Sequence, residues 1–128
     1  MKTRTVPLAV VLVLLCSASS FAHHSVATFF ELEKTVEVKG VVKEFRLVNP
    51  HMRMVIEVTT AAGATEMWTL TGGVTGDLRA AGWLPESIKI GEMVTVSGPP
   101  ARNPKAKGMY VRMLVKADGT KLEQRVRD

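Results

Sequence analysis

Cysteine is almost absent from this sequence. The single cysteine, Cys16, lies within an apolar stretch close to the N-terminus. If that stretch is removed on export, no thiol remains, which excludes disulfides, cysteine nucleophiles and thiolate metal ligands. Aromatic residues are also scarce, at 5% of the chain, so few side chains are available for stacking on bases or sugars.

Long hydrophobic runs are absent as well. The N-terminal apolar run, Leu8–Leu15, is too short for a helix that spans a bilayer, which takes about 20 residues. Lys2 and Arg4 precede this run, and small residues lead to Ala22, as at a signal-peptidase site. We therefore expect residues 1–22 to be a signal peptide that is cleaved after Ala22. The mature protein is then periplasmic and keeps no membrane span.

Two alternatives to a cleaved signal peptide remain open at this point. The first is a retained membrane anchor, which the short apolar run disfavours. The second is a lipoprotein modified at Cys16. That processing needs a small residue before the cysteine, and Leu15 is bulky.

The usual signatures of hydrolases and nucleotide-binding enzymes are missing too. No Gly-x-Ser-x-Gly elbow occurs, and Gly72-Gly73 lacks the Lys-Ser/Thr that completes a phosphate loop. The carboxylates scatter along the chain without forming an evident acid–base pair. We therefore expect a binding module rather than an enzyme.

The expected mature chain is small and only slightly basic. Cleavage after Ala22 leaves 106 of the 128 residues, enough for one domain with a thin core. Loss of Lys2 and Arg4 leaves 15 basic and 12 acidic residues, a net charge of +3. The basic excess is concentrated from Arg102 to Asp128, where there are eight Lys/Arg and three Asp/Glu.

The apolar pattern of the mature chain predicts short strands and one short helix. Residues 23–34 are expected to form an irregular lead-in to a domain that covers 35–128. Alternation of β-branched and apolar residues predicts the following strands: 35–48, with Gly40 marking a bulge or a sharp bend, then 51–58, 66–70, 93–97, 109–116 and 120–125. Thr75 is expected to cap a helix over 76–81 that stops at Gly82, with Trp83 packed behind it.

This order of elements predicts the fold class. Three strands, a helix and two or three more strands are typical of an OB-type barrel. The expected fold is therefore all-β with one short helix, a small OB-like β-barrel of five to six strands. In this barrel, Met52, Met54, Ile56 and Val58 form the core side of the second strand.

Several segments resemble a family of small exported bacterial proteins known only as a domain of unknown function. The matching segments are Ala22-His23-His24-Ser25, Asn49-Pro50-His51, Gly82-Trp83, 87–96 and 117–122. The resemblance implies a periplasmic OB-like domain and no established activity. The methionine-rich start of the second strand, Met52-Arg53-Met54, departs from the pattern.

Three histidines are the candidate metal ligands: His23, His24 and His51. Cleavage after Ala22 gives His23 a free α-amino group beside its imidazole, so one residue can chelate. With His51 this provides two imidazoles and an amine, a set suited to copper(II) or another transition metal. The plain alternative is a solvated terminus, with His51 serving only a turn.

The methionines offer a second class of soft ligand. Six of them remain after cleavage, and thioethers prefer copper(I). Their alternation along strands favours packing in the core instead, since methionine fills irregular gaps.

Surface binding is the alternative function. Arg53, Trp68, Tyr110 and Arg112 are the candidate residues, joined in a basic patch by Arg46, Arg102, Lys105 and Lys107. The expected partners are another exported protein, a saccharide or an anionic surface. Because aromatics are few and net charge is modest, nucleic acid is not expected as a partner. The protein is expected to be a monomer or to associate only weakly. Ordinary solvated strand edges would explain the same basic residues.

Overall fold

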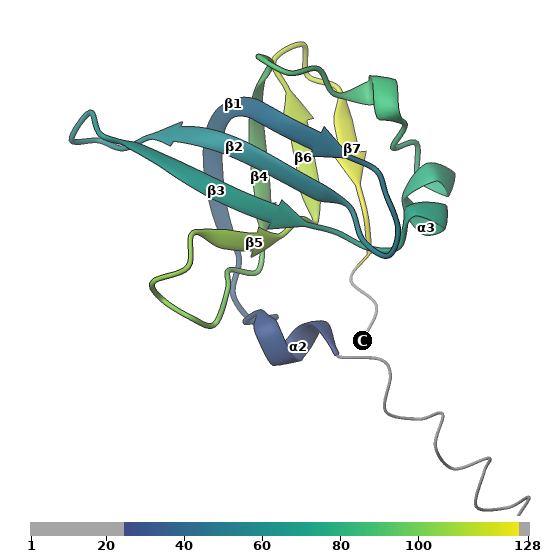
Figure 1. Ribbon diagram of the computed structural model, residues 1–128, viewed down its shortest axis with the longest axis horizontal. Coiled ribbons are helices and arrows are strands. Elements are labelled where there is room, and N and C mark those ends of the chain that lie inside the picture. The colour runs from purple at the N-terminus through teal and green to yellow at the C-terminus, as the bar shows by residue number, and fades with distance from the viewer. Residues whose placement is uncertain (1–24, 126–128) are drawn as a thin grey trace, which may run out of the picture.

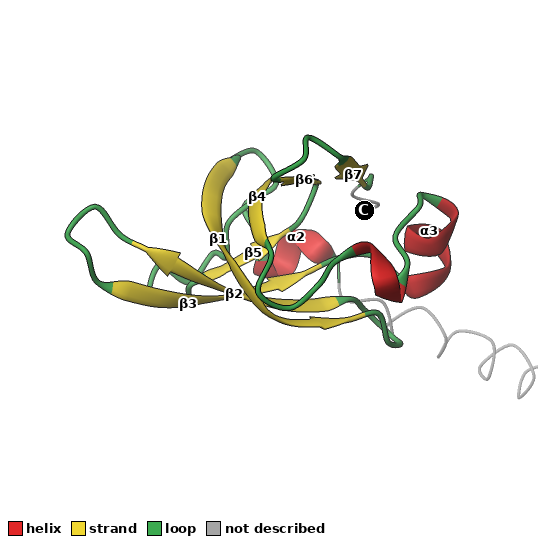
Figure 2. Cartoon of the chain, turned by 90° about the horizontal axis from the view of Figure 1, so that it is seen from above, coloured by secondary structure: helices red, strands yellow, loops and turns green. Residues whose placement is uncertain are grey.

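A single seven-stranded sheet forms the body of the protein. The computed structural model describes residues 25–125, and the strands hydrogen-bond in the order β5-β3-β2-β1-β4-β6-β7 (Figure 1). Within residues 25–125, no helix has the length and apolar character needed to cross a membrane. Figure 2 shows the hairpin between β2 and β3 at the opposite end of the molecule from helix α3.

The first three strands form an antiparallel meander: β1 (Val36–Arg46), β2 (Arg53–Thr59) and β3 (Thr65–Thr71). The expected alternation of the second strand is confirmed, because Met54 and Ile56 are fully buried. The expected bulge lies at a different place. The register shifts between Val42 and Glu44, whereas a Cβ on Gly40 would lie 2.5 Å from the Glu57 carbonyl oxygen. Gly40 thus marks close approach of β2, the other common reason for a strand glycine.

The expected fifth strand is in fact two strands. β4 (Met93–Gly98) pairs with β1, and β5 (Gly108–Tyr110) pairs in parallel with β3. The chain then turns at Val111 and Arg112 into β6 (Met113–Lys116), which pairs with β4. β7 (Lys121–Glu123) returns along β6 as the expected sixth strand. The sheet therefore has seven strands instead of five or six, and its pairing does not close into a barrel.

Helix α3 (Thr75–Ala80) lies where the short helix was expected, but Thr75 does not cap it. Val74 occupies the cap position, and the Thr75 hydroxyl bonds to Asn49 Oδ1 at 2.5 Å. The stop at Gly82 is confirmed, since its φ of +91° is a conformation that glycine adopts readily. The short 3-10 turn η2 (Pro85–Ser87) then leads toward β4.

The core lies between the concave side of the sheet and α3. Trp83 is fully buried there, and its indole nitrogen donates to the Glu123 carbonyl at 3.1 Å. The buried apolar residues form one cluster: Val42, Leu47, Met52, Met54, Ile56, Leu70, Leu78, Trp83, Ile88, Val94, Val96, Met109, Val111, Leu114 and Leu122. Trp83 therefore connects the helical segment with β7.

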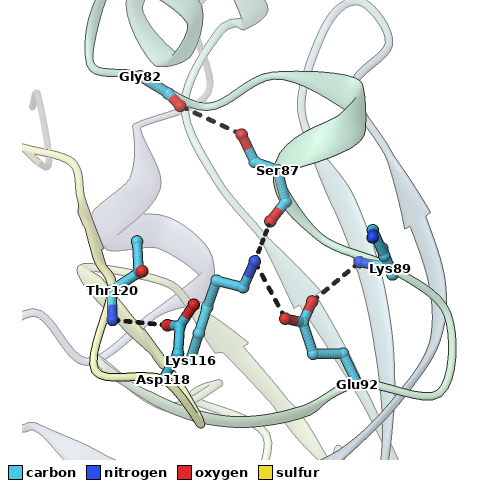
Figure 3. A network of polar contacts seen from close by, with 7 residues as sticks. All are labelled: Gly82, Ser87, Lys89, Glu92, Lys116, Asp118 and Thr120. Atoms are coloured by element: carbon cyan, nitrogen blue, oxygen red, sulfur yellow. Dashed lines mark hydrogen bonds and ion pairs between the residues drawn. The ribbon is translucent and has the colours of Figure 1, made fainter.

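A polar network fastens the segment after α3 to β6 (Figure 3). The Lys116 ammonium contacts Glu92 Oε1 at 3.0 Å and donates to the Ser87 carbonyl at 2.9 Å. The Lys89 amide donates to the other oxygen of Glu92 at 3.0 Å. These contacts hold the pKa of Glu92 below its usual 4.5, first through the Lys89 amide, and with help from Lys116 against the effect of burial.

Replacing Glu92 with glutamine is expected to lower the free energy of unfolding by about 1 kcal/mol near neutral pH, because the pairing with Lys116 is lost. The folded-state pKa of Glu92 is depressed, so its charge contributes fully above about pH 4.5 and less as pH falls through the folded pKa. Urea unfolding of Glu92→Gln and the parent chain between pH 7 and 3 measures this. The gap between the two should close on acidification, while exposed Glu33→Gln should show no such trend. A gap that widens in acid would contradict the assignment.

Candidate functional site

An open pocket of about 950 Å³ lies between the N-terminal segment, α3 and the turn that joins β5 to β6. Its lining comes from four parts of the chain: Ser25 and Val26; Gly73, Val74, Asp77, Leu78, Ala80 and Ala81; Tyr110, Arg112 and Met113; Glu123, Gln124 and Arg125. The walls are mainly apolar, and two carboxylates balance two guanidinium groups. Binding would therefore depend on individual polar groups and not on a net field.

The N-terminal segment is fixed against the body of the protein, and it includes a short helix where an irregular lead-in was expected. This helix is α2 (Val26–Phe29), and the Ser25 hydroxyl caps it by accepting from the Ala27 amide at 3.2 Å. Arg102 donates to the Ala27 carbonyl at 2.6 Å from its side chain and to the Phe29 carbonyl at 2.9 Å from its backbone. The position at which the described chain begins, beside the pocket, is thus set by contacts far along the sequence.

Two more contacts hold the segment that follows α2. Arg112 donates to the Leu32 carbonyl at 2.9 Å and to the Thr35 hydroxyl at 3.4 Å. The Phe30 ring meets the Tyr110 ring edge-on, with centroids 5.8 Å apart at 68°. Arg112 and Tyr110 therefore support the lead-in and line the pocket at the same time.

Tyr110 is the most enclosed polar side chain of the pocket, with 5% of its surface exposed. Burial raises the pKa of its phenol, and the negative charge of Asp77 adds to the rise. The phenol therefore stays protonated at neutral pH and can donate a hydrogen bond. A Cβ on Gly73 would lie 3.4 Å from its hydroxyl oxygen, so the hydroxyl lies beside the Gly73 backbone.

Gln124 is a pocket residue that the sequence analysis missed. Its side-chain oxygen accepts from the Gly73 amide at 2.8 Å, and its side-chain nitrogen donates to the Val111 carbonyl. A Cβ on Gly72 would lie 2.7 Å from that nitrogen, which explains why glycine is needed there. The Gly72-Gly73 pair was the one feature of the sequence that pointed to this contact, because glycine in or beside a strand often marks the close approach of another group.

His51 lies exposed in the turn that precedes β2. The Met52 amide, one residue later, donates to the Gly73 carbonyl at 3.4 Å, and Gly73 lines the pocket. The turn also contains a cis peptide bond between Asn49 and Pro50. His51 is thus next to a residue that bonds to the pocket lining, but it does not itself line the pocket.

His23 and His24 lie outside the described residues, and Ser25 is the residue that follows them. Among residues 25–125, no group of three or more His, Cys, Asp or Glu side chains could hold a metal ion. Of the methionines, Met52, Met54 and Met109 are fully buried in the core, whereas Met67 and Met93 are exposed. The thioethers thus do not gather on one surface.

The four residues expected to bind a surface partner do not share one face. Tyr110 and Arg112 line the pocket, whereas Arg53 and Trp68 do not. Arg53 contacts Glu44 at 3.3 Å. Trp68 is half-buried and donates to Glu66, and the Lys107 ammonium lies 5.9 Å from the centre of its ring.

Comparison with known proteins matches the chain to a family model and to several solved structures. The model for a family of unknown function, DUF6152, matches residues 10–112. No curated protein matches the chain. The mitochondrial single-stranded DNA binding protein Rim1 from S. cerevisiae is similar at 14% identity and a TM-score of 0.49, over 72% of this chain and 96% of that one. The dimeric N-terminal domain of PriB from Thermoanaerobacter tencongensis is similar at 16% identity and a TM-score of 0.45, over 66% and 97%. The expected OB-like fold is confirmed, in a sheet that does not close.

Two expectations about partners are wrong in the light of these structures. The sequence analysis set nucleic acid aside and expected a monomer. The solved structures are described as a single-stranded DNA binding protein and as a dimer. Both expectations are withdrawn. At this level of identity the likeness concerns the fold alone and assigns no partner to this chain.

Proposed function

The chain belongs to DUF6152, a family of unknown function, and from its own residues we propose that it is an exported module that binds a copper ion or another transition-metal ion. The ligands are the imidazole and α-amino group of His23 at the mature N-terminus, the imidazole of His51, and His24 as a further donor. Export by a signal peptide over residues 1–22 is part of the proposal, because cleavage after Ala22 creates the amine.

One observation supports the proposal: the chain enters the described structure at the pocket, and a pocket residue, Gly73, is hydrogen-bonded to the neighbour of His51. Ser25 and Gly73 line the same pocket, and Gly73 bonds to the residue after His51. His23 is only two residues before Ser25, and an extended chain covers at most about 3.3–3.6 Å per residue. Arg102 and Arg112 hold the lead-in, and this gives the chain a fixed point of attachment from which, in our proposal, His23 reaches His51.

The donor set decides which metals fit. Two imidazoles and an amine are nitrogen ligands, which suit copper(II), nickel(II) and zinc(II). Calcium and magnesium need oxygen ligands, and no carboxylate cluster is found among the described residues. Copper(II) heads the series of affinities for nitrogen sites, so it is the ion to test first.

The test is copper(II) titration of the mature chain that begins at His23, against His23→Ala and His51→Ala. Each variant is expected to bind copper(II) at least about 10-fold more weakly, because loss of one ligand removes part of a chelate. The Nα-acetylated form of the chain that begins at His23 is the matched comparison, since it keeps every imidazole and converts the free amine to an amide. It should weaken binding as well.

Two results would reject the proposal. One is equal copper(II) affinity in the parent chain and both alanine variants. The other is a mature N-terminus, measured by mass spectrometry on protein recovered from the exported fraction, that does not begin at His23.

A further inference from the structure

The pocket beside α3 has the size and the walls of a small-molecule site, which the proposed metal site does not explain. Its volume of about 950 Å³ lies at the upper end of the range of about 300–1,000 Å³ that is usual for such sites. The apolar part of its lining comes from α2, from α3 with its two cap positions, and from β6: Val26, Val74, Leu78, Ala80, Ala81 and Met113. Such walls hold the apolar body of a ligand by removing it from water.

Two of the polar side chains in the lining already serve the fold. Arg112 donates to two oxygen atoms of the lead-in. Both ends of the Gln124 side chain are hydrogen-bonded to the backbone, at Gly73 and at Val111. These groups therefore shape the walls of the pocket.

The Tyr110 hydroxyl is a donor that the fold leaves unused. Its side chain is only 5% exposed, yet the hydroxyl takes part in no hydrogen bond within residues 25–125. No buried side-chain oxygen or nitrogen in this range lacks a partner, so the hydroxyl oxygen must be accessible at the pocket that Tyr110 lines. It lies beside Gly73, which is also part of the lining. An enclosed donor without a partner in the fold points to a ligand that supplies one.

The charges around the pocket define the ligand. Burial, and then the negative charge of Asp77, raises the pKa of the Tyr110 phenol, so this group is a donor at neutral pH. The same carboxylate disfavours an anionic acceptor at the phenol. The guanidinium groups of Arg112 and Arg125 in the lining disfavour a cation. An uncharged oxygen acceptor meets neither repulsion.

We propose that this pocket binds an uncharged, largely apolar small molecule whose carbonyl or ether oxygen accepts a hydrogen bond from the Tyr110 hydroxyl. The apolar walls provide most of the affinity, and the hydrogen bond orients the ligand. The site goes beyond the proposed metal-binding function. All of its residues lie in the described part of the chain, and it needs no metal ion.

The test is titration of the mature chain with prodan, a neutral naphthyl ketone whose emission reports both polarity and hydrogen bonding at its carbonyl group. EDTA is present throughout to remove metal ions. Saturable binding with blue-shifted emission is expected, and it should be tighter than the binding of anilinonaphthalene sulfonate, an anion of similar size.

Tyr110→Phe is expected to bind prodan about 3- to 10-fold more weakly, the usual effect of one lost hydrogen bond. The bound probe should also emit further to the blue, because its carbonyl group has lost a donor. The phenylalanine keeps the ring that packs on Phe30, so circular dichroism should show a folded protein.

A matched pair of valines tests the apolar walls. Val74 lines the pocket and is 46% exposed, whereas Val48 is 49% exposed and is not part of the lining. Val74 is the N-cap of α3, and aspartate is a preferred N-cap residue, so Val74→Asp should remain folded. It is expected to bind prodan about 10-fold more weakly, because a charge replaces an apolar contact. Val48→Asp should bind as the parent chain does.

Three results would overturn the proposal. The first is no saturable binding of prodan, or binding no tighter than that of the sulfonate; the pocket would then belong to another kind of ligand. The second is unchanged affinity and emission in Tyr110→Phe. The third is an equal loss of affinity in Val74→Asp and Val48→Asp. Because EDTA removes metal ions, none of these results depends on whether the histidines bind copper(II).

Discussion

Replacing Trp83 with alanine is expected to lower the free energy of unfolding by about 3–5 kcal/mol, the usual loss for a fully buried tryptophan. The variant loses the packing of the indole on α3 and leaves a cavity. It also loses the hydrogen bond to the Glu123 carbonyl, and with it the connection between the helical segment and β7. For a domain of this size, that loss is a large share of the total stability. Urea unfolding followed by circular dichroism measures it.

The other tryptophan is the matched control. Trp68 is half-buried and packs only against the edge of the core. Trp68→Ala should therefore cost clearly less than Trp83→Ala. Trp83→Phe should fall between the parent chain and Trp83→Ala, because it keeps an aromatic ring in the core and loses the hydrogen bond. Equal losses for Trp68→Ala and Trp83→Ala would show that Trp83 does not hold the two segments together.

Those parts of the fold that depend on neighbouring residues could be predicted from the sequence. The alternation from Met52 to Ile56 identified the buried face of β2, and the glycine at 82 identified the end of α3. Asp118-Gly119 is a typical two-residue hairpin sequence, and Gly119 lies in the turn between β6 and β7 with a φ of +88°. In each case the local chemistry of one or two residues decides the conformation.

The division of residues 108–116 into β5 and β6 could not be predicted from neighbouring residues. Residues 109–116 were predicted to be one strand, and in a single strand Met109, Val111, Met113 and Val115 would share one face. In the structure Met109 and Val111 are buried and Leu114 is buried next, so the phase changes at Arg112. The cause is pairing with two different strands, β3 on one side and β4 on the other. The pattern of neighbouring residues does not show which distant strand each segment pairs with.

The contacts that form the pocket could not be predicted from neighbouring residues either. Arg102 and Arg112 were expected to belong to a basic surface patch, and their observed contacts are with the carbonyl groups of Ala27 and Leu32. These contacts join residues 75 and 80 positions apart. A sequence shows that an arginine is present, but only the fold shows which carbonyl groups it meets. The residues that organise the candidate site are therefore those whose roles were least predictable.

Gly98 is the second position at which a small change is expected to have a large effect. A Cβ there would lie well inside van der Waals contact with the Tyr110 carbonyl oxygen and 3.0 Å from the Arg112 amide nitrogen. Both obstacles are backbone atoms at the turn from β5 into β6, so no side chain can swing away. We expect Gly98→Ala to lower the free energy of unfolding by about 3 kcal/mol or more. Because the turn carries Tyr110 and Arg112, the pocket should be disturbed in any protein that still folds.

Gly76 provides the same chemical change in open space. A Cβ on Gly76 would meet no heavy atom within 4 Å, and the residue lies in α3. Gly76→Ala is therefore expected to raise the free energy of unfolding by about 0.5–1 kcal/mol, because alanine loses less backbone entropy than glycine in a helix. Urea unfolding of the two variants should thus move in opposite directions from the parent chain. If Gly98→Ala is as stable as the parent, the backbone of β4 does not pass as close to the β5–β6 turn as the structure indicates. The packing that orients Tyr110 toward the pocket would then need to be revised with it.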